Sequence, residues 1–319
     1  MIRYIVTGGA GFIGSNLVRA LLKEPGARVE VIDNYYTGKR ENLAEVWPDI
    51  QVHETDVRDY DSVLRVVRGA DVVFHLAAIP SVPRSIKEPL PSHDININGT
   101  FAVLRACREG GVGRVVYAAS SSAYGDTPTL PKVESMAPNP KSPYAAQKLM
   151  GEYYVSCFHS CFGLDAVALR YFNVYGPRQD PSSPYSGVIS IFMNAVLDRR
   201  SPVIHGDGNQ TRDFTYVEDV AALCIKAARA ANVGGRTFNA GNGNRYTLNE
   251  VWRLLNKIEG VDIAAQYGPP REGDVRDSMA DTTLAVEYLG HSPRFSLEEG
   301  LRRTLGWYSR EHARSAALA

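Results

Sequence analysis

A glycine-rich turn near the amino terminus constrains this chain more than any other stretch of its sequence. Residues 7–14 read Thr-Gly-Gly-Ala-Gly-Phe-Ile-Gly and lie between an apolar strand pattern and an amphipathic helix pattern. The glycines fit two spacings, G-x-G-x-x-G from Gly9, Gly11 and Gly14, and G-x-x-G-x-x-G from Gly8, Gly11 and Gly14. Glycine lets the backbone turn sharply and approach a pyrophosphate closely, and the following helix offers free N–H groups to the anion. The turn therefore predicts a dinucleotide-binding unit.

A carboxylate follows at the distance that such a unit uses to bind ribose. Asp33 stands nineteen residues after Gly14, at the end of the second predicted strand. There it can accept hydrogen bonds from both ribose hydroxyls and repel a 2′-phosphate, which favours NAD over NADP, although Lys39 and Arg40 lie nearby. Asp56, after the third strand, can accept from the adenine amino group or cap the next helix, and both interpretations stay open.

Short apolar runs alternate with longer amphipathic segments through the first half of the chain. The strand candidates are residues 4–7, 29–32, 51–55, 72–75, 114–118 and 166–170, and the helix candidates are 13–23, 62–68, 99–108 and 145–158. Strands that are apolar on both faces and separated by helices indicate a parallel sheet covered on both sides. Right-handed crossovers then give a doubly wound α/β sheet of the Rossmann type.

The character of the sequence changes after Gly176. Residues 177–184 hold three prolines and predict a loop, and shorter, less regular elements follow. We expect an NAD-binding domain of residues 1–173 with a return segment at about 213–240, which contains a helix pattern over 215–231. A smaller, discontinuous α/β substrate domain is expected from residues 174–212 and 241–312, and residues 312–319 are expected to be frayed.

Composition and charge exclude several classes of protein. The chain has 319 residues, of which 44% are hydrophobic, and this is enough for a sizeable core. Lys and Arg number 35, and so do Asp and Glu, so the net charge of zero favours neither nucleic acid nor an anionic membrane. The start of the chain lacks a signal-peptide pattern, and no stretch approaches about 18 uncharged apolar residues, so we expect a cytoplasmic protein without a membrane span.

The four cysteines form no CxxC pair. They are Cys107, Cys157, Cys161 and Cys224, and no matching set of histidines or cysteines completes a metal site around them. We interpret all four as buried small apolar residues and predict no metal.

A second motif carries acid–base chemistry. Tyr144 and Lys148 form a Y-x-x-x-K, and on a helix these two positions share one face. A nearby ammonium favours the phenolate, so the motif predicts a pKa of Tyr144 lowered toward neutrality and a base for a sugar hydroxyl. Ser120, Ser121 and Ser122 follow the fifth predicted strand, at the edge where open α/β sheets place their active sites.

These motifs together resemble the extended short-chain dehydrogenase/reductase family, the NAD-dependent epimerases and dehydratases. The stretches that carry the resemblance are residues 7–14, 33–34, 75–78, 96–100, 120–125, 142–148, 170–177 and 271–274. The resemblance implies NAD as cofactor and a UDP-sugar as substrate. It implies that Tyr144 is the catalytic base and Lys148 its pKa partner. The catalytic serine is Ser120 by its position four residues before Tyr124, with Ser121 or Ser122 as alternatives.

The resemblance also implies binding roles along the chain. Contacts with NAD are implied for Gly8, Gly11, Phe12, Ile13, Gly14, Asp33, Asn34, Gly38, Asp56, Val57, Leu76, Ala77, Ala78, Asn96, Ala118, Tyr144, Lys148 and Tyr171, where Asn96 usually holds a strand backbone. Contacts with the substrate are implied for Ser81, Ser122, Asn173, Gly187, Val188, Phe192, Val203, Ile204, His205, Arg212, Arg271, Asp274 and Ser278. Of these, Arg212 and Arg271 would hold the diphosphate, and Ser278 would border the C2 substituent of the sugar.

The residues after the catalytic serine select among the reactions of the family. Dehydratases carry an Asp-Glu pair there and UDP-glucuronate decarboxylases a glutamate, whereas this chain has Ser121 and Ser122. We therefore expect a UDP-hexose 4-epimerase that uses tightly bound NAD and a 4-keto intermediate on UDP-glucose/UDP-galactose and their N-acetylated counterparts. A UDP-glucuronate 4-epimerase, a keto-sugar reductase and a non-catalytic NAD-sensing protein are the alternatives. Helices near 92–108 and 144–158 resemble a two-fold four-helix bundle, which implies a homodimer.

Overall fold

A seven-stranded parallel sheet forms the centre of the computed structural model, which describes residues 1–180, 187–270 and 275–318. The strand order is β11-β6-β5-β4-β1-β2-β3, and every neighbouring pair is parallel. The strands are β1 (Ile2–Thr7), β2 (Ala27–Asp33), β3 (Ile50–Glu54), β4 (Val72–His75), β5 (Arg114–Ser120), β6 (Ala166–Tyr171) and β11 (Thr237–Ala240). The predicted doubly wound parallel sheet is confirmed, and the strand order reverses between β1 and β4.

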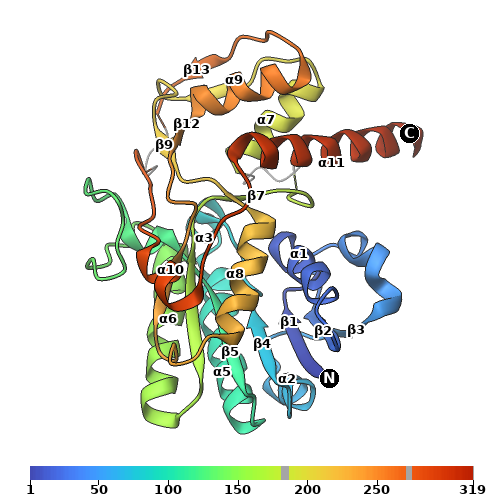
Figure 1. Cartoon of the computed structure of the whole chain (residues 1–319), viewed down its shortest axis with the longest axis vertical. Helices are drawn as coiled ribbons and strands as arrows, with labels where there is room; N and C mark the ends of the chain where they lie inside the picture. Colours follow the sequence, from blue (N-terminus) through green and yellow to red (C-terminus); the bar gives the residue numbers. More distant parts are fainter. Residues whose placement is uncertain (181–186, 271–274, 319) are drawn as a thin grey trace.

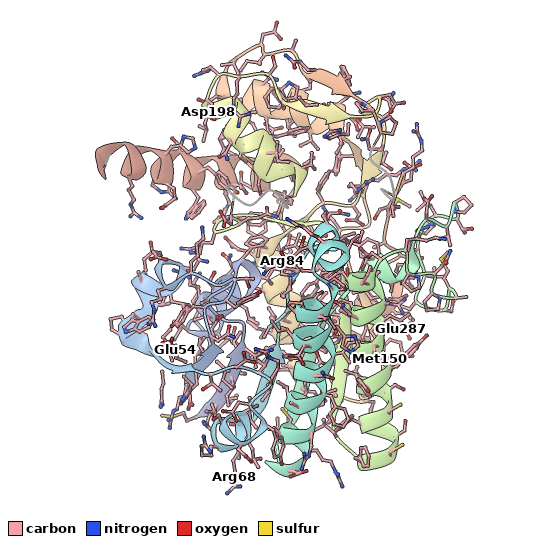
Figure 2. All side chains as sticks on the ribbon, turned by 180° about the vertical axis from the view of Figure 1, so that it is seen from behind. Glu54, Arg68, Arg84, Met150, Asp198 and Glu287 are labelled. Carbon is pink, nitrogen blue, oxygen red and sulfur yellow. The ribbon has the colours of Figure 1, made fainter. Side chains whose placement is uncertain are left out.

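Helices cover both faces of the sheet (Figures 1 and 2). One face packs against α1 (Phe12–Leu21), α8 (Val217–Arg229) and α10 (Thr283–Leu289), and the other against α2 (Tyr60–Val67), α5 (Thr100–Glu109) and α6 (Pro143–Phe162). Because successive strand residues point to opposite faces, Tyr4 and Val6 of β1 belong to the first core and Ile5 to the second. Burial on both sides explains why the central strands β4, β5 and β6 are mostly apolar, whereas β3 at the edge of the sheet carries exposed polar residues.

A second group of elements lies above the sheet in Figure 1 and has its own apolar core. Its helices are α7 (Val188–Leu197), α9 (Leu248–Glu259) and α11 (Leu297–Leu318). Its short strands pair as β7 (Val174–Tyr175) with β10 (Thr215–Tyr216), β8 (Val203–His205) with β13 (Gln266–Gly268), and β9 (Thr211–Arg212) with β12 (Tyr246–Thr247). The return segment brings α8 and β11 to the sheet, and α10, which the expected boundaries assign to the substrate domain, packs there as well.

The carboxyl-terminal residues continue a helix instead of fraying. α11 runs to Leu318, so the expectation of a frayed end over residues 312–319 is wrong for the part that the structure describes. Three of the last seven residues of α11, Ala313, Ala316 and Ala317, are alanines, the strongest helix former, and Arg314 pairs with Glu311 at 3.0 Å.

The cysteines divide into a buried and an exposed pair. Cys107 and Cys224 are buried, whereas Cys157 and Cys161 are exposed on α6, so the interpretation of all four as buried residues is wrong. Positions four apart share one helix face, and here that face points outward. Within residues 1–180, 187–270 and 275–318, no three His, Cys, Asp or Glu side chains gather as a metal site. Over the same ranges, no helix is long and apolar enough to cross a membrane.

Candidate active site

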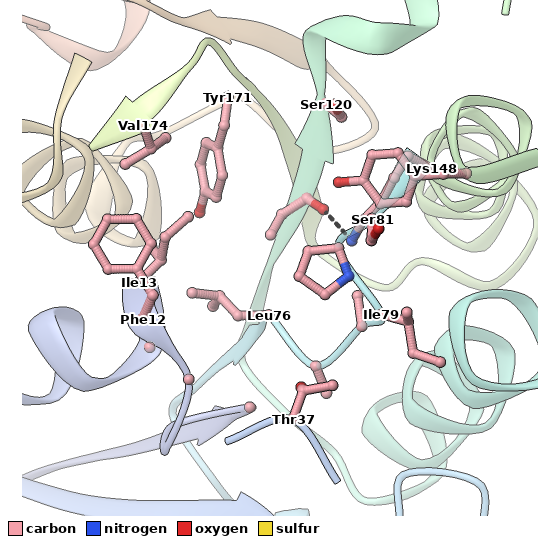
Figure 3. A pocket seen from close by; sticks show the side chains of 18 of the residues that line it. Phe12, Ile13, Thr37, Leu76, Ile79, Ser81, Ser120, Lys148, Tyr171 and Val174 are labelled. Atoms are coloured by element: carbon pink, nitrogen blue, oxygen red, sulfur yellow. Dashed lines mark hydrogen bonds between the residues drawn. The ribbon is translucent and has the colours of Figure 1, made fainter. Parts of the chain in front are cut away.

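A cavity of about 990 Å³ lies beside the carboxyl ends of β1 and β4, where the strand order reverses. Ligands of open α/β sheets bind in the crevice at such a reversal. Figure 3 shows Phe12, Ile13 and Leu76 on one part of its wall and Ser120 and Lys148 on another. The cavity therefore brings the glycine turn and the Y-x-x-x-K motif, more than a hundred residues apart in the chain, to one site.

The glycine turn packs so closely against neighbouring backbone that it has no room for larger residues. A Cβ on Gly8 would lie 2.7 Å from the backbone nitrogen of Ala77, and one on Gly14 would lie 2.1 Å from the carbonyl oxygen of Gly8. Gly8 also has a φ of 70°, which favours glycine. α1 follows with Gly11 at its N-cap and no side-chain cap, so the N–H groups of its first turn are available to an anion. The turn fits the pyrophosphate of a dinucleotide.

Asp33 ends β2 on the wall of the same cavity. Its carboxylate accepts the backbone N–H groups of Ala10 at 2.9 Å and Tyr35 at 2.8 Å. Burial raises the pKa of Asp33, and the two backbone hydrogen bonds oppose that rise. The two nearby cations pair with other carboxylates than Asp33. Lys39 pairs with Asp180 at 2.9 Å, and Arg40 pairs with Glu54 at 2.5 Å. This arrangement fits a ribose with free hydroxyls better than one with a 2′-phosphate.

Asp56 lies farther along the cofactor part of the cavity. It accepts from the Asn34 side chain at 2.9 Å, and the Arg58 guanidinium beside it holds the pKa of its carboxyl below its usual value. The alternative that Asp56 caps the next helix is wrong, because Asp59 caps α2 by accepting the N–H of Ser62 at 3.1 Å.

The local sequence places the catalytic candidates at one edge of the sheet. Ser142 caps α6 by accepting the N–H of Ala145, and Tyr144 follows in the first turn. Ser120 ends β5 and caps the short helix η3 (Ser121–Tyr124). Ser122 donates its hydroxyl to that of Ser120 at 2.9 Å. All three serines line the cavity together with Tyr144 and Lys148, and Ser120 is the one that affects the pKa of Tyr144.

The electrostatics of this pair differ from the expectation. Burial raises the pKa of Tyr144 to about 12, and its hydrogen bond with Ser120 opposes that rise. Burial lowers the pKa of Lys148 to about 8, and the Glu152 carboxylate opposes that shift. The expected lowering of the Tyr144 pKa is therefore wrong for the protein alone. Desolvation of the phenolate dominates, and the Lys148 ammonium donates to the carbonyl oxygen of Ala118 at 2.9 Å.

Most of the implied cofactor residues meet at this cavity. Those that line it are Gly8, Gly11, Phe12, Ile13, Gly14, Asp33, Asn34, Gly38, Asp56, Val57, Leu76, Ala77, Ala78, Ala118, Tyr144, Lys148 and Tyr171. Asn96 does not line it. Its buried amide accepts the N–H of Ile79 at 2.8 Å and donates to the Gln147 side chain at 2.8 Å, which ties the loop that follows β4 to α6.

The implied substrate residues divide into two sets. Ser81, Ser122, Asn173, Gly187, Arg212 and Ser278 line the cavity, whereas Val188, Phe192, Val203, Ile204 and His205 do not. Phe192 and Ile204 are buried in the core of the second group, because the apolar faces of α7 and β8 are turned toward it. Arg271 and Asp274 lie outside the described residues.

Several cavity residues carry no motif that sequence reasoning could have used. Arg84, Lys132, Arg178 and Asp180 line the cavity, and they come from loops or short helices distant from the glycine turn. Arg178 reaches Glu45 at 2.9 Å across 133 positions of the chain. Only the three-dimensional arrangement identifies such residues.

Comparison with known proteins agrees with this geometry. The model of the NAD-dependent epimerase/dehydratase family matches residues 4–241. A UDP-glucose 4-epimerase from Mycolicibacterium smegmatis is 39% identical over 310 residues, which cover 96% of this chain and 98% of that protein.

Solved structures with this fold include two other sugar-nucleotide epimerases. A UDP-N-acetylglucosamine 4-epimerase from Methanobrevibacter ruminantium, in complex with UDP-N-acetylmuramic acid, superposes with a TM-score of 0.93 at 39% identity, covering 97% of this chain and 99% of that one. A UDP-glucuronic acid 4-epimerase from Bacillus cereus, in complex with UDP-glucuronic acid and NAD, has a TM-score of 0.91 at 32% identity, covering 97% and 100%.

The chain belongs to the NAD-dependent epimerase/dehydratase family. Within it, the protein is an NAD-dependent enzyme of the UDP-sugar 4-epimerase branch, whose reaction is an isomerisation. The cradle formed by the glycine turn, Asp33 and the first turn of α1 fits the NAD that this membership implies.

Proposed function

We propose that the protein interconverts UDP-glucose with UDP-galactose and UDP-N-acetylglucosamine with UDP-N-acetylgalactosamine. The observation that carries this proposal is that small Ser278 lines the same cavity as Tyr144 and Ser120. A small residue beside C2 leaves room for an N-acetyl group. Ser121 and Ser122 follow Ser120 on this wall, so the proton donor that elimination of the C6 hydroxyl requires is missing at that position.

The catalytic residues move one proton at the C4 oxygen. Tyr144 takes the proton of the C4 hydroxyl as the C4–H bond breaks, and Ser120, which lines the same cavity, helps to relay it. When bound, NAD supplies the acceptor that takes the C4 hydride and returns it, and its charged nicotinamide ring favours the phenolate. Tyr144 then reprotonates the oxygen after the hydride returns to the other face of the sugar. No oxidant is consumed, because oxidation and reduction cancel within one turnover.

The substrate must stay anchored while the oxidised sugar turns. Arg212 and Asn173 line the cavity in the second group of elements and are suited to hold the diphosphate. Arg212 donates to the carbonyl oxygens of Thr211 at 2.9 Å and Arg276 at 3.0 Å, which fixes its guanidinium on the wall. Anchoring at the diphosphate leaves the bond between sugar and phosphate as the axis of rotation.

Product analysis tests the substrate range directly. The protein is incubated separately with UDP-glucose, UDP-N-acetylglucosamine and UDP-glucuronate, each with and without added NADH. The products are identified by NMR while absorbance at 340 nm follows free NADH. We expect C4 epimers of the first two sugars and no net NADH. Net consumption of NADH would indicate a reductase, and epimerisation of UDP-glucuronate alone would replace the proposed substrates.

Ser278→Tyr tests the role of the small wall residue. The added ring should remove turnover of the N-acetylated pair and spare UDP-glucose. Overfilling a fitted site costs about 1–3 kcal/mol, and only the N-acetyl group at C2 needs the space that the ring would occupy. Ser278→Ala is the matched control and should retain both activities. Equal loss of both substrates in Ser278→Tyr would contradict the proposed role.

We also propose a cytoplasmic homodimer that forms through α5 and α6. Phe101, Met150, Tyr153 and Phe162 are exposed large apolar residues on these two helices, which lie side by side in Figure 2. A second copy related by a two-fold axis would bury this surface as a four-helix bundle. Met150→Glu should shift sedimentation toward the monomer, whereas Val286→Glu on α10, at a similarly exposed apolar site, should not. A wild-type monomer at micromolar concentration would contradict the proposal.

The four free cysteines accord with a reducing compartment.

A further inference from the structure

A buried ion pair lies one helical turn beyond Lys148 on α6. Arg170 on β6 donates from Nε to both carboxylate oxygens of Glu152, at 3.0 and 3.1 Å, and from Nη2 to Oε2 at 2.7 Å. The Glu152 and Arg170 side chains are only 3% and 6% exposed. The guanidinium also lies 4.6 Å from the centre of the Tyr124 ring. Because burying two charges costs desolvation free energy that their attraction barely offsets, stability alone is a poor explanation for this pair.

Glu152 follows Lys148 by four positions on α6, a spacing that puts the two side chains on the same face of the helix. Lys148 donates to the carbonyl oxygen of Ala118 and lies 5.1 Å from the centre of the Tyr117 ring. The titratable groups around it are Tyr117 on β5, His75 on β4, and Tyr144 and Glu152 on α6. Burial raises the pKa of Tyr117 well above its usual value and lowers that of His75 to about 3, so both are neutral at pH 7. Among these groups, Glu152 supplies the negative charge.

We propose that Glu152, clamped by Arg170, is a positioning residue that keeps Lys148 charged and in place at the active-site cavity. A buried ammonium loses its proton readily, and a nearby carboxylate opposes that loss. Burial raises the pKa of Glu152, and the hydrogen bonds and charge of Arg170 oppose that rise. The three hydrogen bonds from Arg170 also hold the carboxylate in one place and favour its ionised form. The ion pair thereby supports a charge at the reaction site that it does not itself touch.

The test compares the titration of Lys148 with the pH dependence of turnover. Glu152→Gln keeps the shape and one oxygen acceptor for Arg170 but removes the charge. The pKa of Lys148 is measured by NMR of protein labelled with 13C- and 15N-lysine, with Lys148→Arg for assignment, and kcat/KM is measured from pH 6 to 10. We expect the Lys148 pKa and the alkaline limb of kcat/KM to fall together by about one pH unit. Bound NAD and the far-UV spectrum should stay unchanged.

Glu134→Gln is the matched control. Glu134 is also partly buried, feels the charge of Arg170, and accepts the N–H of Asn239 at 2.7 Å. The Glu134→Gln variant should therefore show the wild-type pKa of Lys148 and the wild-type alkaline limb of kcat/KM. If Glu152→Gln does not fold, Arg170→Lys, which keeps the charge but loses the bidentate clamp, should give a smaller downward shift.

The proposal rests on the proposed function only for its kinetic readout. Should no UDP-hexose be epimerised, the proposed function fails, and the NMR titration alone decides the role of Glu152. Unchanged Lys148 titration in a folded Glu152→Gln variant overturns the proposal, even if its stability falls.

Discussion

Gly14 is the position at which one added methyl group should do most damage to the cofactor turn. A Cβ there would lie 2.1 Å from the carbonyl oxygen of Gly8 and 2.9 Å from both the carbonyl carbon of Gly8 and the Cα of Gly9. A carbon–oxygen contact normally stays beyond about 3.3 Å, so the turn and α1 must separate by about 1.2 Å. All three neighbours are backbone atoms, and no side-chain rotation can relieve the collision.

The collision competes with helix propensity. Gly14 lies in the first turn of α1, and alanine is favoured over glycine within a helix by about 1 kcal/mol. Overfilling a packed site costs about 1–3 kcal/mol, and displacement of backbone belongs at the upper end of that range. We therefore expect Gly14→Ala to lower the free energy of unfolding by about 1–2 kcal/mol. NAD affinity should fall at least about tenfold, or about 1.4 kcal/mol, because the displaced turn no longer approaches the pyrophosphate.

Two measurements separate these effects. Urea unfolding gives the change in stability, and titration of cofactor-free protein with NAD gives the change in affinity. Gly306→Ala in α11 is the control, since its Cβ would meet only the end of the flexible Arg310 side chain at 3.8 Å. That variant should gain up to about 1 kcal/mol of stability and bind NAD normally. Wild-type stability together with wild-type NAD affinity in Gly14→Ala would refute the close approach of turn and helix.

Two further predictions concern the active site, and a third concerns Asp213, a buried carboxylate that accepts the backbone N–H groups of Asn242, Gly243 and Ala280. Tyr144→Phe should reduce kcat by about 10²-fold or more while NAD titration shows unchanged binding, and near-normal turnover would exclude Tyr144 as the base. Asp33→Ala should weaken NAD binding and relax discrimination against NADP in competition titrations, and unchanged NAD affinity would contradict its ribose role. Burial raises the pKa of the Asp213 carboxyl to about 6, above the value of about 4 that it has in the unfolded chain. The contribution of Asp213 to the free energy of unfolding is therefore fully present below about pH 4 and is lost as the pH rises through 6. In urea unfolding, the loss of unfolding free energy caused by Asp213→Asn should therefore be smaller at pH 7 than at pH 4, by up to about 3 kcal/mol. A loss that grows between pH 4 and pH 7 would contradict the raised pKa.

The chain carries much of its fold and its chemistry in local patterns. Apolar runs of strand length separated by amphipathic helices predict a parallel sheet with both faces covered, because a strand buried on both sides has no polar face. The glycine turn and the Y-x-x-x-K spacing are equally local, since each depends on backbone geometry within a few residues. Those patterns were sufficient to predict the sheet and a dinucleotide cofactor, whereas the reaction class was implied by the resemblance to the epimerase and dehydratase family.

Other features depend on which segments pack together. Phe192 and Ile204 are apolar residues in the stretch implied to bind the substrate, yet they are buried in the core of the second group, and sequence spacing does not reveal that choice. The pKa of Tyr144 follows desolvation in the folded site rather than its distance along a helix from Lys148. Glu152 acquires its proposed role only because β6 brings Arg170 beside it.

Periodicity and glycine conformation act over a few residues, and the sequence alone therefore determined the sheet, the phosphate-binding turn and the catalytic motif. Burial, charge neighbours and the composition of the cavity wall depend on segments that are far apart in the chain. Only the tertiary structure could decide that Arg178, on the cavity wall, donates a hydrogen bond to Glu45 and that α10 packs on the sheet. Long-range packing sets both contacts.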